Sequence, residues 1–223
     1  MSGKLIVLDG LDGSGKSTQA ELLFEAIRAE KEDVKLISFP DYNDPSSALV
    51  RMYLGGEFSD NADDVNAYAA SSFYAVDRYA SYMRYWKEFY EAGGVILATR
   101  YVSSNAIHQM VKLEKEEWDA YLSWLSDFEY GKLALPKPDR VIFLDMPRAV
   151  ADRLIESRYG GDESKKDIHE KNRTYLQKCQ ETASYAAKKE DWSVVSCAEN
   201  GEVRAKEAIA AEILAIVKKE LYA

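Results

Sequence analysis

The sequence has little of what marks secreted, membrane-spanning or disulfide-bonded proteins. Its 223 residues include two cysteines, Cys179 and Cys197, which do not form a CxxC pair and are too few for a disulfide framework. No stretch approaches the roughly 20 apolar residues of a membrane span. The apolar run near the N-terminus is too short for a signal peptide. We therefore expect a reduced, cytoplasmic protein without a membrane segment.

Blocks of positive charge are also missing. The formal net charge is −9, and Lys and Arg do not cluster anywhere in the chain. An acidic protein repels the backbone of DNA and RNA, so we expect no nucleic-acid partner, and any anionic ligand must be small and held by a few local cations. A hydrophobic content of 47% supports the core of one domain over residues 1–223, without repeats or linkers.

Short apolar runs alternate with longer amphipathic ones along the whole chain. Several of the short runs are apolar throughout, which is typical of strands covered on both faces. We expect strands at Leu5–Asp9, Val34–Phe39, Val95–Thr99, Arg140–Asp145 and Trp192–Ser196. We expect helices at Lys16–Lys31, Pro45–Leu54, Asp64–Ala92, Ser103–Val111, Lys115–Phe128, Pro147–Ser157, His169–Lys189 and Glu202–Leu221. This order predicts an α/β fold: a five-stranded parallel sheet flanked by helices, with ligands at the carboxyl ends of the strands.

The stretch GLDGSGKST follows the first expected strand and satisfies the GxxxxGK[ST] pattern. Its glycines let several backbone N–H groups converge, and the helix that follows adds the positive end of its dipole. Lys16 can reach the β- and γ-phosphates of a nucleotide, and the Ser17 hydroxyl can ligate Mg²⁺. We therefore predict a P-loop NTPase fold. The expected ATP-binding residues are Gly10, Leu11, Asp12, Gly13, Ser14, Gly15, Lys16, Ser17 and Thr18.

Three further polar stretches should lie at the same edge of the sheet: SFPDYNDPSS, SSFYAVDRYASY and ATRYVSSNAIHQ. Tyr74 and Arg78 are four residues apart on one helix face, so a ring for stacking and a donor for a carbonyl stand together. Together the two side chains could hold a nucleobase. The alternative to this ligand-binding role is a buried tyrosine beside a salt-bridged arginine.

Arg100 stands just past the third strand, where a guanidinium can bind a phosphate in bidentate fashion. On the helix that follows, Ser104, Asn105 and Gln109 offer hydroxyl and amide groups to a ligand, although each alone would also suit a helix cap or a surface.

Together, these stretches resemble the thymidylate kinase family, which phosphorylates dTMP to dTDP with ATP in the synthesis of dTTP. The resemblance extends from Leu5 to Asn172 and rests on LDGLDGSGKST, FPDY, FYAVDR, RYVSSNAIHQ and PDRVIFLDMP. It implies Mg²⁺ as cofactor, ATP and dTMP as small-molecule substrates, and a homodimer packed through the long helices.

The resemblance also implies roles for single residues. Asp12 would lie near the acceptor's sugar and the metal. Phe39 and Tyr42 would form a wall beside the sugar and phosphate. Tyr74 would stack on thymine, and Arg78 would donate to its O4.

In the third stretch, Arg100 would hold the acceptor phosphate, and Asn105 and His108 would read the pyrimidine and line the sugar. Ser104 and Gln109 complete the expected dTMP site.

One position departs from the family pattern. Thr99 stands where the family usually has an aspartate, so either Thr99 would hold a water there or Asp9, Asp12 or Asp145 would supply the carboxylate. We expect Ser17 as a metal ligand, with Asp12 as a further candidate.

Residue 13 is glycine, so the phosphate loop lacks the extra arginine that some family members carry there. The resemblance then implies a mobile lid, approximately residues 153–173, as the source of positive charge. Arg153 and Arg158 are its best candidates, and the alternative is a solvated charged loop. The expected catalytic residues are Lys16, Arg100, Asp12, Arg153 and Arg158.

Other functions remain as alternatives: a kinase of another nucleotide or of a deoxynucleoside, or a non-catalytic nucleotide-binding protein of the same fold. A deoxynucleoside kinase would show an acidic residue before an R-S pair, where this chain has Thr99-Arg100-Tyr101. An N-K-x-D motif typical of GTPases and the GxPGxGK loop of adenylate kinases are both missing.

Overall fold

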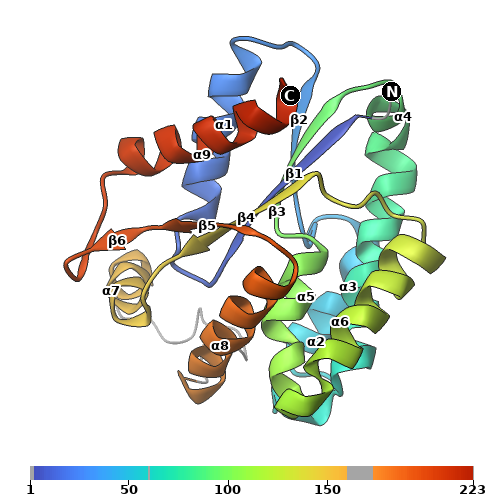
Figure 1. The fold of residues 1–223 in the computed structure, drawn as a ribbon. Helices are drawn as coiled ribbons and strands as arrows, with labels where there is room; N and C mark the ends of the chain where they lie inside the picture. The colour runs from blue at the N-terminus through green and yellow to red at the C-terminus, as the bar shows by residue number, and fades with distance from the viewer. Residues whose placement is uncertain (1–2, 60, 160–172, 223) are drawn as a thin grey trace.

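A parallel sheet of five strands runs through the centre of the molecule (Figure 1). The computed structural model describes residues 3–59, 61–159 and 173–222, without the side chains of residues 62, 157–159, 173 and 174. The strands lie in the order β2-β3-β1-β4-β5. They are β1 (Lys4–Gly10), β2 (Val34–Ser38), β3 (Val95–Thr99), β4 (Arg140–Asp145) and β5 (Ser193–Ser196). All five expected strands are confirmed.

The central strand β1 pairs with β3 on one side and with β4 on the other. Its residues Leu5 to Leu8 have no solvent exposure. A strand buried on both faces needs apolar side chains at every position, which explains its continuous apolar run. β1 therefore ends, at Gly10, in the middle of the sheet's carboxyl edge.

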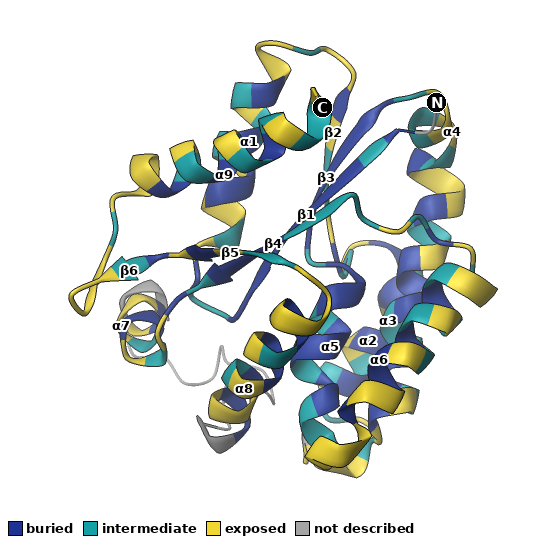
Figure 2. Cartoon of the chain, in the orientation of Figure 1, coloured by how far each residue is buried: buried dark blue, intermediate teal, exposed yellow. Residues whose placement is uncertain are grey.

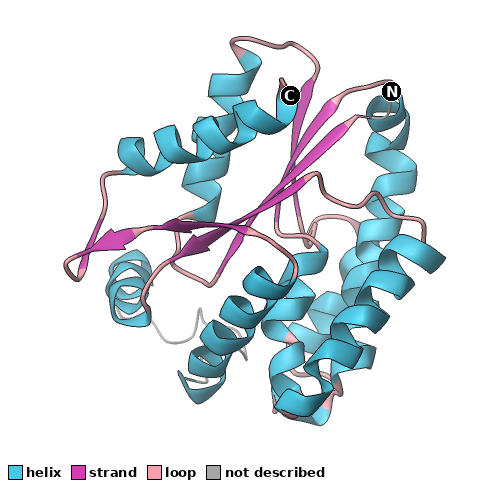
Figure 3. Cartoon of the chain, in the orientation of Figure 1, coloured by secondary structure: helices cyan, strands magenta, loops and turns pink. Residues whose placement is uncertain are grey.

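Helices cover both faces of the sheet (Figures 2 and 3). On one face α1 (Lys16–Arg28) and α9 (Lys206–Leu221) bury Leu23, Ile27 and Ile213 against it. On the other face, side chains of α5 (Val102–His108), α6 (Trp118–Ser126) and the long helix that begins with α3 (Ala67–Ser81) form a second apolar cluster. α8 (Arg173–Lys189) packs beside α5. The remaining helices are α2 (Ala48–Leu54) and α7 (Arg148–Tyr159), with the 3-10 turns η1 (Pro45–Ser47), η2 (Ala62–Asp64), η4 (Met110–Lys112) and η5 (Lys115–Glu117).

Two of the expected helices contain a wider turn that the sequence pattern does not indicate. After α3 the chain forms the π-helical turn η3 (Tyr82–Trp86) and then continues as α4 (Lys87–Glu91). After α6 it forms the π-helical turn η6 (Asp127–Lys132). Such turns shift the helix face by about one residue and are frequent at functional sites.

The expected start of the last helix at Glu202 is wrong, because α9 begins at Lys206. The preceding residues form a small antiparallel hairpin of β6 (Ala198–Glu199) and β7 (Glu202–Val203). Asn200 and Gly201 form its turn with φ values of 52° and 77°. An Asn-Gly pair favours this turn, since both residues tolerate positive φ.

None of the helices within the described ranges is long and apolar enough to cross a membrane. Much of the expected lid, including Lys165, Lys166 and Lys171, lies outside the described residues.

Candidate active site

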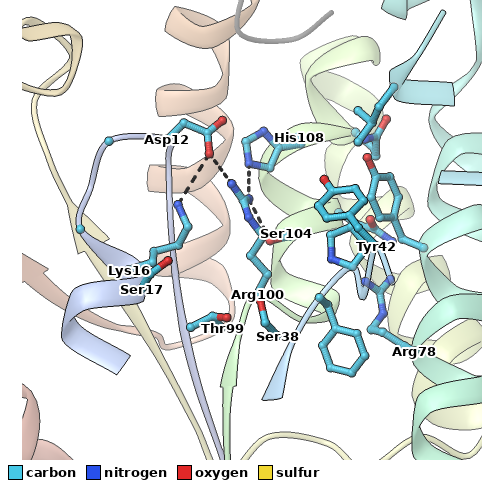
Figure 4. A pocket seen from close by; sticks show the side chains of 18 of the residues that line it. Asp12, Lys16, Ser17, Ser38, Tyr42, Arg78, Thr99, Arg100, Ser104 and His108 are labelled. Carbon is cyan, nitrogen blue, oxygen red and sulfur yellow. Dashed lines mark hydrogen bonds and ion pairs between the residues drawn. The ribbon is translucent and has the colours of Figure 1, made fainter. Parts of the chain in front are cut away.

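A pocket of about 490 Å³ opens at the carboxyl edge of the sheet, where β1, β2 and β3 end (Figure 4). Most of the site residues expected from the sequence line it: Asp12, Gly13, Gly15, Lys16, Ser17, Thr18, Phe39, Tyr42, Tyr74, Arg78, Arg100, Ser104, Asn105, His108 and Gln109. Ser38, Pro40, Leu54 and Thr99 also line it, without having been singled out as ligand-binding residues. The fold thus brings four distant stretches of the chain to one cavity.

The phosphate loop connects β1 to α1 and forms one wall of this pocket. Lys16 begins α1, and its Nζ donates to the carbonyl oxygens of Gly10 (2.9 Å) and Leu11 (2.8 Å). Ser17 and Thr18 are exposed in the first turn of the helix. The loop therefore presents a cation and a hydroxyl at the positive end of a helix dipole, which suits the phosphates of a nucleotide.

Gly13 lies directly against α7. Its φ is 81°, and a Cβ at this position would lie 2.9 Å from the carbonyl oxygen of Ala151 and 3.1 Å from Cγ1 of Ile155. A side chain at residue 13, such as the arginine of some family members, would therefore require the backbone of α7 to shift.

Arg100 occupies the edge of β3 with a φ of 62°, which is uncommon for a residue with a side chain. Its Nη2 donates to Oδ1 of Asp12 at 2.5 Å, and its Nη1 lies 3.0 Å from Nε2 of His108. Because a guanidinium only donates hydrogen bonds, this nitrogen of His108 is the acceptor. Burial alone would lower the pKa of Arg100, but the carboxylates of Asp12 and Asp9 outweigh burial and raise it.

Asp12 connects the two cations at this end of the pocket. Its Oδ1 lies 2.5 Å from Arg100 and 3.8 Å from Nζ of Lys16. Figure 4 shows Lys16, Asp12, Arg100 and His108 in a continuous chain of contacts. Two cations that converge on one carboxylate create a site for a polyanion, because their charges are aimed at the same small volume.

The opposite end of the pocket is aromatic and more deeply buried. The ring of Tyr74 meets that of Tyr53 edge-on, with centroids 6.4 Å apart, and the ring of Phe39 packs on Tyr101. Arg78 lies on the far side of Arg100 from the phosphate loop (Figure 4). This end suits a flat, partly apolar group such as a nucleobase.

Arg78 has a partner that the sequence analysis missed. Its Nε and Nη2 donate to the two carboxylate oxygens of Glu129, at 2.6 and 2.5 Å. Burial raises the pKa of Glu129 in spite of the guanidinium beside it, while Glu129 raises the pKa of Arg78 against the opposing effect of burial. Arg78 is therefore a salt-bridged arginine, as one of the two alternatives has it, and it also lines the pocket.

Of the two lid arginines, Arg153 does not reach the pocket. It is exposed, and its Nη2 donates to the carbonyl oxygen of Gly201 at 2.6 Å. On α7 the residues that face the phosphate loop are Ala151 and Ile155, and Arg153 lies on the other side of the helix. The side chain of Arg158 lies outside the described part of the structure.

The side-chain oxygens around the phosphate loop suit the coordination of a magnesium ion carried by a nucleotide. Such an ion needs one or two protein ligands, since phosphates and waters supply the others. The described residues hold no group of three acidic, histidine or cysteine side chains that would bind a metal unaided. The Ser17 hydroxyl and the Asp12 carboxylate line the pocket, whereas Asp9 accepts from Ser103 and Ser104 and lies behind the loop.

A comparison with known protein families matches residues 8–209 to the model of thymidylate kinase. The chain belongs to the thymidylate kinase family. The thymidylate kinase of Mycobacterium tuberculosis is 32% identical over 155 residues, which are 69% of this chain and 71% of that protein. A probable thymidylate kinase of Pyrobaculum aerophilum is 25% identical over 214 residues, 96% of each chain.

A solved structure supports the fold independently. The thymidylate kinase of Candida albicans superposes with a TM-score of 0.70 at 21% identity, over 99% of this chain and 94% of the other. The P-loop NTPase fold and the family expected from the motifs are thus confirmed. Membership of this family makes the protein an ATP-dependent nucleoside monophosphate kinase.

Proposed function

We propose that this thymidylate kinase family member transfers the γ-phosphoryl group of Mg-ATP to dTMP, and that its pocket holds the two nucleotides with their phosphates facing each other. The observation that carries this proposal is the convergence of Lys16 and Arg100 on Asp12. The product, dTDP, is the immediate precursor of dTTP.

In the proposed reaction the phosphate loop binds ATP from Gly10 to Thr18, with Lys16 at the transferred group. Arg100 binds the phosphate of dTMP, assisted by Ser104. An oxygen of this phosphate attacks the γ-phosphorus of ATP in line, the bond from the γ-phosphorus to the β,γ-bridging oxygen breaks, and ADP leaves. No strong base is needed, because a phosphate monoester is already ionised near neutral pH. Catalysis then consists of alignment and charge neutralisation.

Magnesium bound with ATP would neutralise charge on the phosphate oxygens, held on the protein side by Ser17 and Asp12. For the lid cation we retain Arg158, since Arg153 is engaged with Gly201. Closure of a lid excludes water, which would otherwise hydrolyse ATP.

For the nucleoside, we propose that Tyr74 stacks on the base while Arg78, Asn105 and Gln109 contact its polar edge. Gln109 supports this role as an amide side chain among the residues that line the pocket. Phe39, Tyr42 and His108 would line the sugar and phosphate.

We also propose that the protein is a cytoplasmic homodimer. Val76, Tyr79 and Met83 follow one face of the long helix and are each more than 40% exposed. An apolar stripe of this kind suits a second copy of the chain. Static light scattering would test the dimer, and a monomer at micromolar concentration would contradict it.

The cytoplasmic location is supported by the two cysteines. The free, buried thiols of Cys179 and Cys197 suit a reducing compartment.

A coupled assay of ADP release with a panel of nucleoside 5′-monophosphates, with and without Mg²⁺, tests the reaction. We expect metal-dependent turnover with dTMP as the preferred acceptor. Lys16→Met should reduce kcat by at least about 100-fold, because it removes the cation at the transferred group. Lys188→Met, an exposed position on α8, serves as the control. A protein that binds ATP but converts none of the monophosphates would refute the proposal.

A further inference from the structure

Glu129 is a fully buried carboxylate at the base end of the pocket, and the motifs assign it no role. It has no solvent exposure and lies in the π-helical turn η6. A buried carboxylate is expensive unless it is paired and hydrogen-bonded. The hydrogen-bond partners of Glu129 therefore indicate its role.

These partners are two residues that line the pocket. Arg78 donates to both carboxylate oxygens, at 2.6 and 2.5 Å. Asn105 donates from Nδ2 to Oε1 at 3.2 Å. Arg78 comes from α3 and Asn105 from α5, so Glu129 links two separate elements at the same end of the cavity.

The contacts of Asn105 determine which way its amide points. Nδ2 also lies 3.3 Å from the backbone oxygen of Ser71. A carboxylate and a backbone carbonyl oxygen both only accept hydrogen bonds, so the side of the amide that faces them must be its NH₂ group. The carbonyl oxygen of Asn105 is then left on the opposite side and available to the pocket as an acceptor.

Arg78 is oriented in the same way. The guanidinium has five N–H bonds, of which Glu129 takes two and the backbone oxygen of Tyr101, at 3.2 Å from Nη1, takes one. The two that remain belong to Nη1 and Nη2, on the edge that Glu129 does not occupy. This edge can only donate.

We propose that Glu129 sets the base specificity of the enzyme by fixing Arg78 as a donor and Asn105 as an acceptor at the base end of the pocket. A neighbouring carbonyl and imino N–H, as in thymine and uracil at positions 4 and 3, complement this pair. Cytosine instead presents an amine to the Arg78 donor and an unprotonated ring nitrogen to the Asn105 acceptor. Neither pair can form a hydrogen bond. The assignment rests on the proposed function for its choice of a pyrimidine monophosphate.

Glu129→Gln tests the proposal, because it keeps the size of the side chain and removes one acceptor oxygen. The new NH₂ group faces either Arg78 or Asn105. If it faces Asn105, the Asn105 amide turns its carbonyl oxygen toward residue 129 to accept from it, and its own NH₂ then points toward the base. We expect kcat/KM for dTMP to fall about 10- to 100-fold, mainly through KM, as for the loss of hydrogen bonds to a charged group. The preference for dTMP over dCMP should fall at least about tenfold.

Glu129→Asp is the second variant, since it preserves the charge if the glutamine variant does not fold. Its side chain is one methylene shorter and cannot keep both partners at the present distances, so a partial loss of the same preference is expected. Glu116→Gln, at an exposed position ahead of α6, is the matched control and should match the wild type.

Calorimetric titration of dTMP and dCMP against each folded variant accompanies the kinetics. If the wild-type protein turns over no monophosphate, the proposed function is refuted. The ratio of the dissociation constants for dTMP and dCMP would still test the role of Glu129 in base specificity. A folded variant that keeps the wild-type dTMP:dCMP ratio overturns the role of Glu129. So does an equal loss of kcat with all monophosphates, because it indicates a merely structural residue.

Discussion

Two glycines of the phosphate loop allow the contact between this loop and α7 to be measured. Both Gly13 and Gly15 have positive φ values, 81° and 85°. A Cβ at Gly13 would lie 2.9 Å from the backbone oxygen of Ala151, whereas a Cβ at Gly15 has nothing within 4 Å. Gly13→Ala and Gly15→Ala therefore differ mainly in the collision with α7, although Gly15 is also the N-cap of α1, where glycine is preferred to alanine.

The expected magnitudes follow from this difference. An alanine in the left-handed region costs about 1–2 kcal/mol, and both variants lose this amount. Any change in the entropy of the unfolded chain is also the same in both. Gly13→Ala additionally forces the backbone of α7 to move, at a cost of about 1–3 kcal/mol, typical of overpacking. We thus expect it to be the less stable variant by that amount.

Urea unfolding followed by circular dichroism measures both free energies, and the comparison holds where the two m-values agree. Equal destabilisation of the two variants, or a greater loss for Gly15→Ala, would refute the packing of α7 on residue 13. Nucleotide affinity is a less suitable readout, because both positions lie in the phosphate loop.

Three other residues give predictions that need one measurement each. Arg100→Lys keeps the charge but loses the planar fork, so KM for dTMP should rise about tenfold in steady-state kinetics while KM for ATP changes little; an unchanged KM for dTMP contradicts its role. Burial lowers the pKa of Lys112 from 10.5 to about 8. The unfolded chain then binds more protons between these values, so the free energy of unfolding should rise with pH there, and Lys112→Met should lack this rise. The hydroxyl of Tyr85 and the backbone N–H of Ser46 hold the pKa of Asp44 at about 2, below its ordinary 3.8. The stability that Asp44 provides is therefore complete above pH 3.8 and is lost as the pH falls toward 2. In urea titrations, Asp44→Asn should lose less unfolding free energy on acidification than the wild type. Equal losses in the two proteins would contradict this role of Asp44.

The sheet and the phosphate loop are predictable from the sequence because their signals are local. Each strand is a short run of apolar residues, and the loop carries its chemistry in nine consecutive positions. The carboxyl edge of a parallel sheet then gathers the residues that follow the strands, so the placement of Arg100 beside the loop also follows from topology.

Glu129 could not be found in this way. Its contact with Arg78 joins residues 51 positions apart, and although the spacing of Trp118, Leu122 and Leu125 places residue 129 on the buried face, periodicity does not identify a buried partner. An acidic residue at a position where the helical spacing expects an apolar one is the available signal, and it does not identify a partner. The family resemblance implied Arg153 as a lid cation, whereas in this structure its guanidinium donates to the backbone oxygen of Gly201 and is not among the residues that line the pocket.

The two arginines of the pocket show why the partner matters as much as the residue. Arg100 pairs with Asp12, whose side chain is 26% exposed, while Arg78 pairs with Glu129, which is completely buried. A phosphate that enters the pocket can replace Asp12, because the displaced carboxylate is already near water and near Lys16. Nothing can replace Glu129 without leaving a buried charge unpaired. In the proposed reaction, Arg100 is thus suited to a ligand that exchanges with each turnover, and Arg78 to a fixed arrangement that the base would have to match.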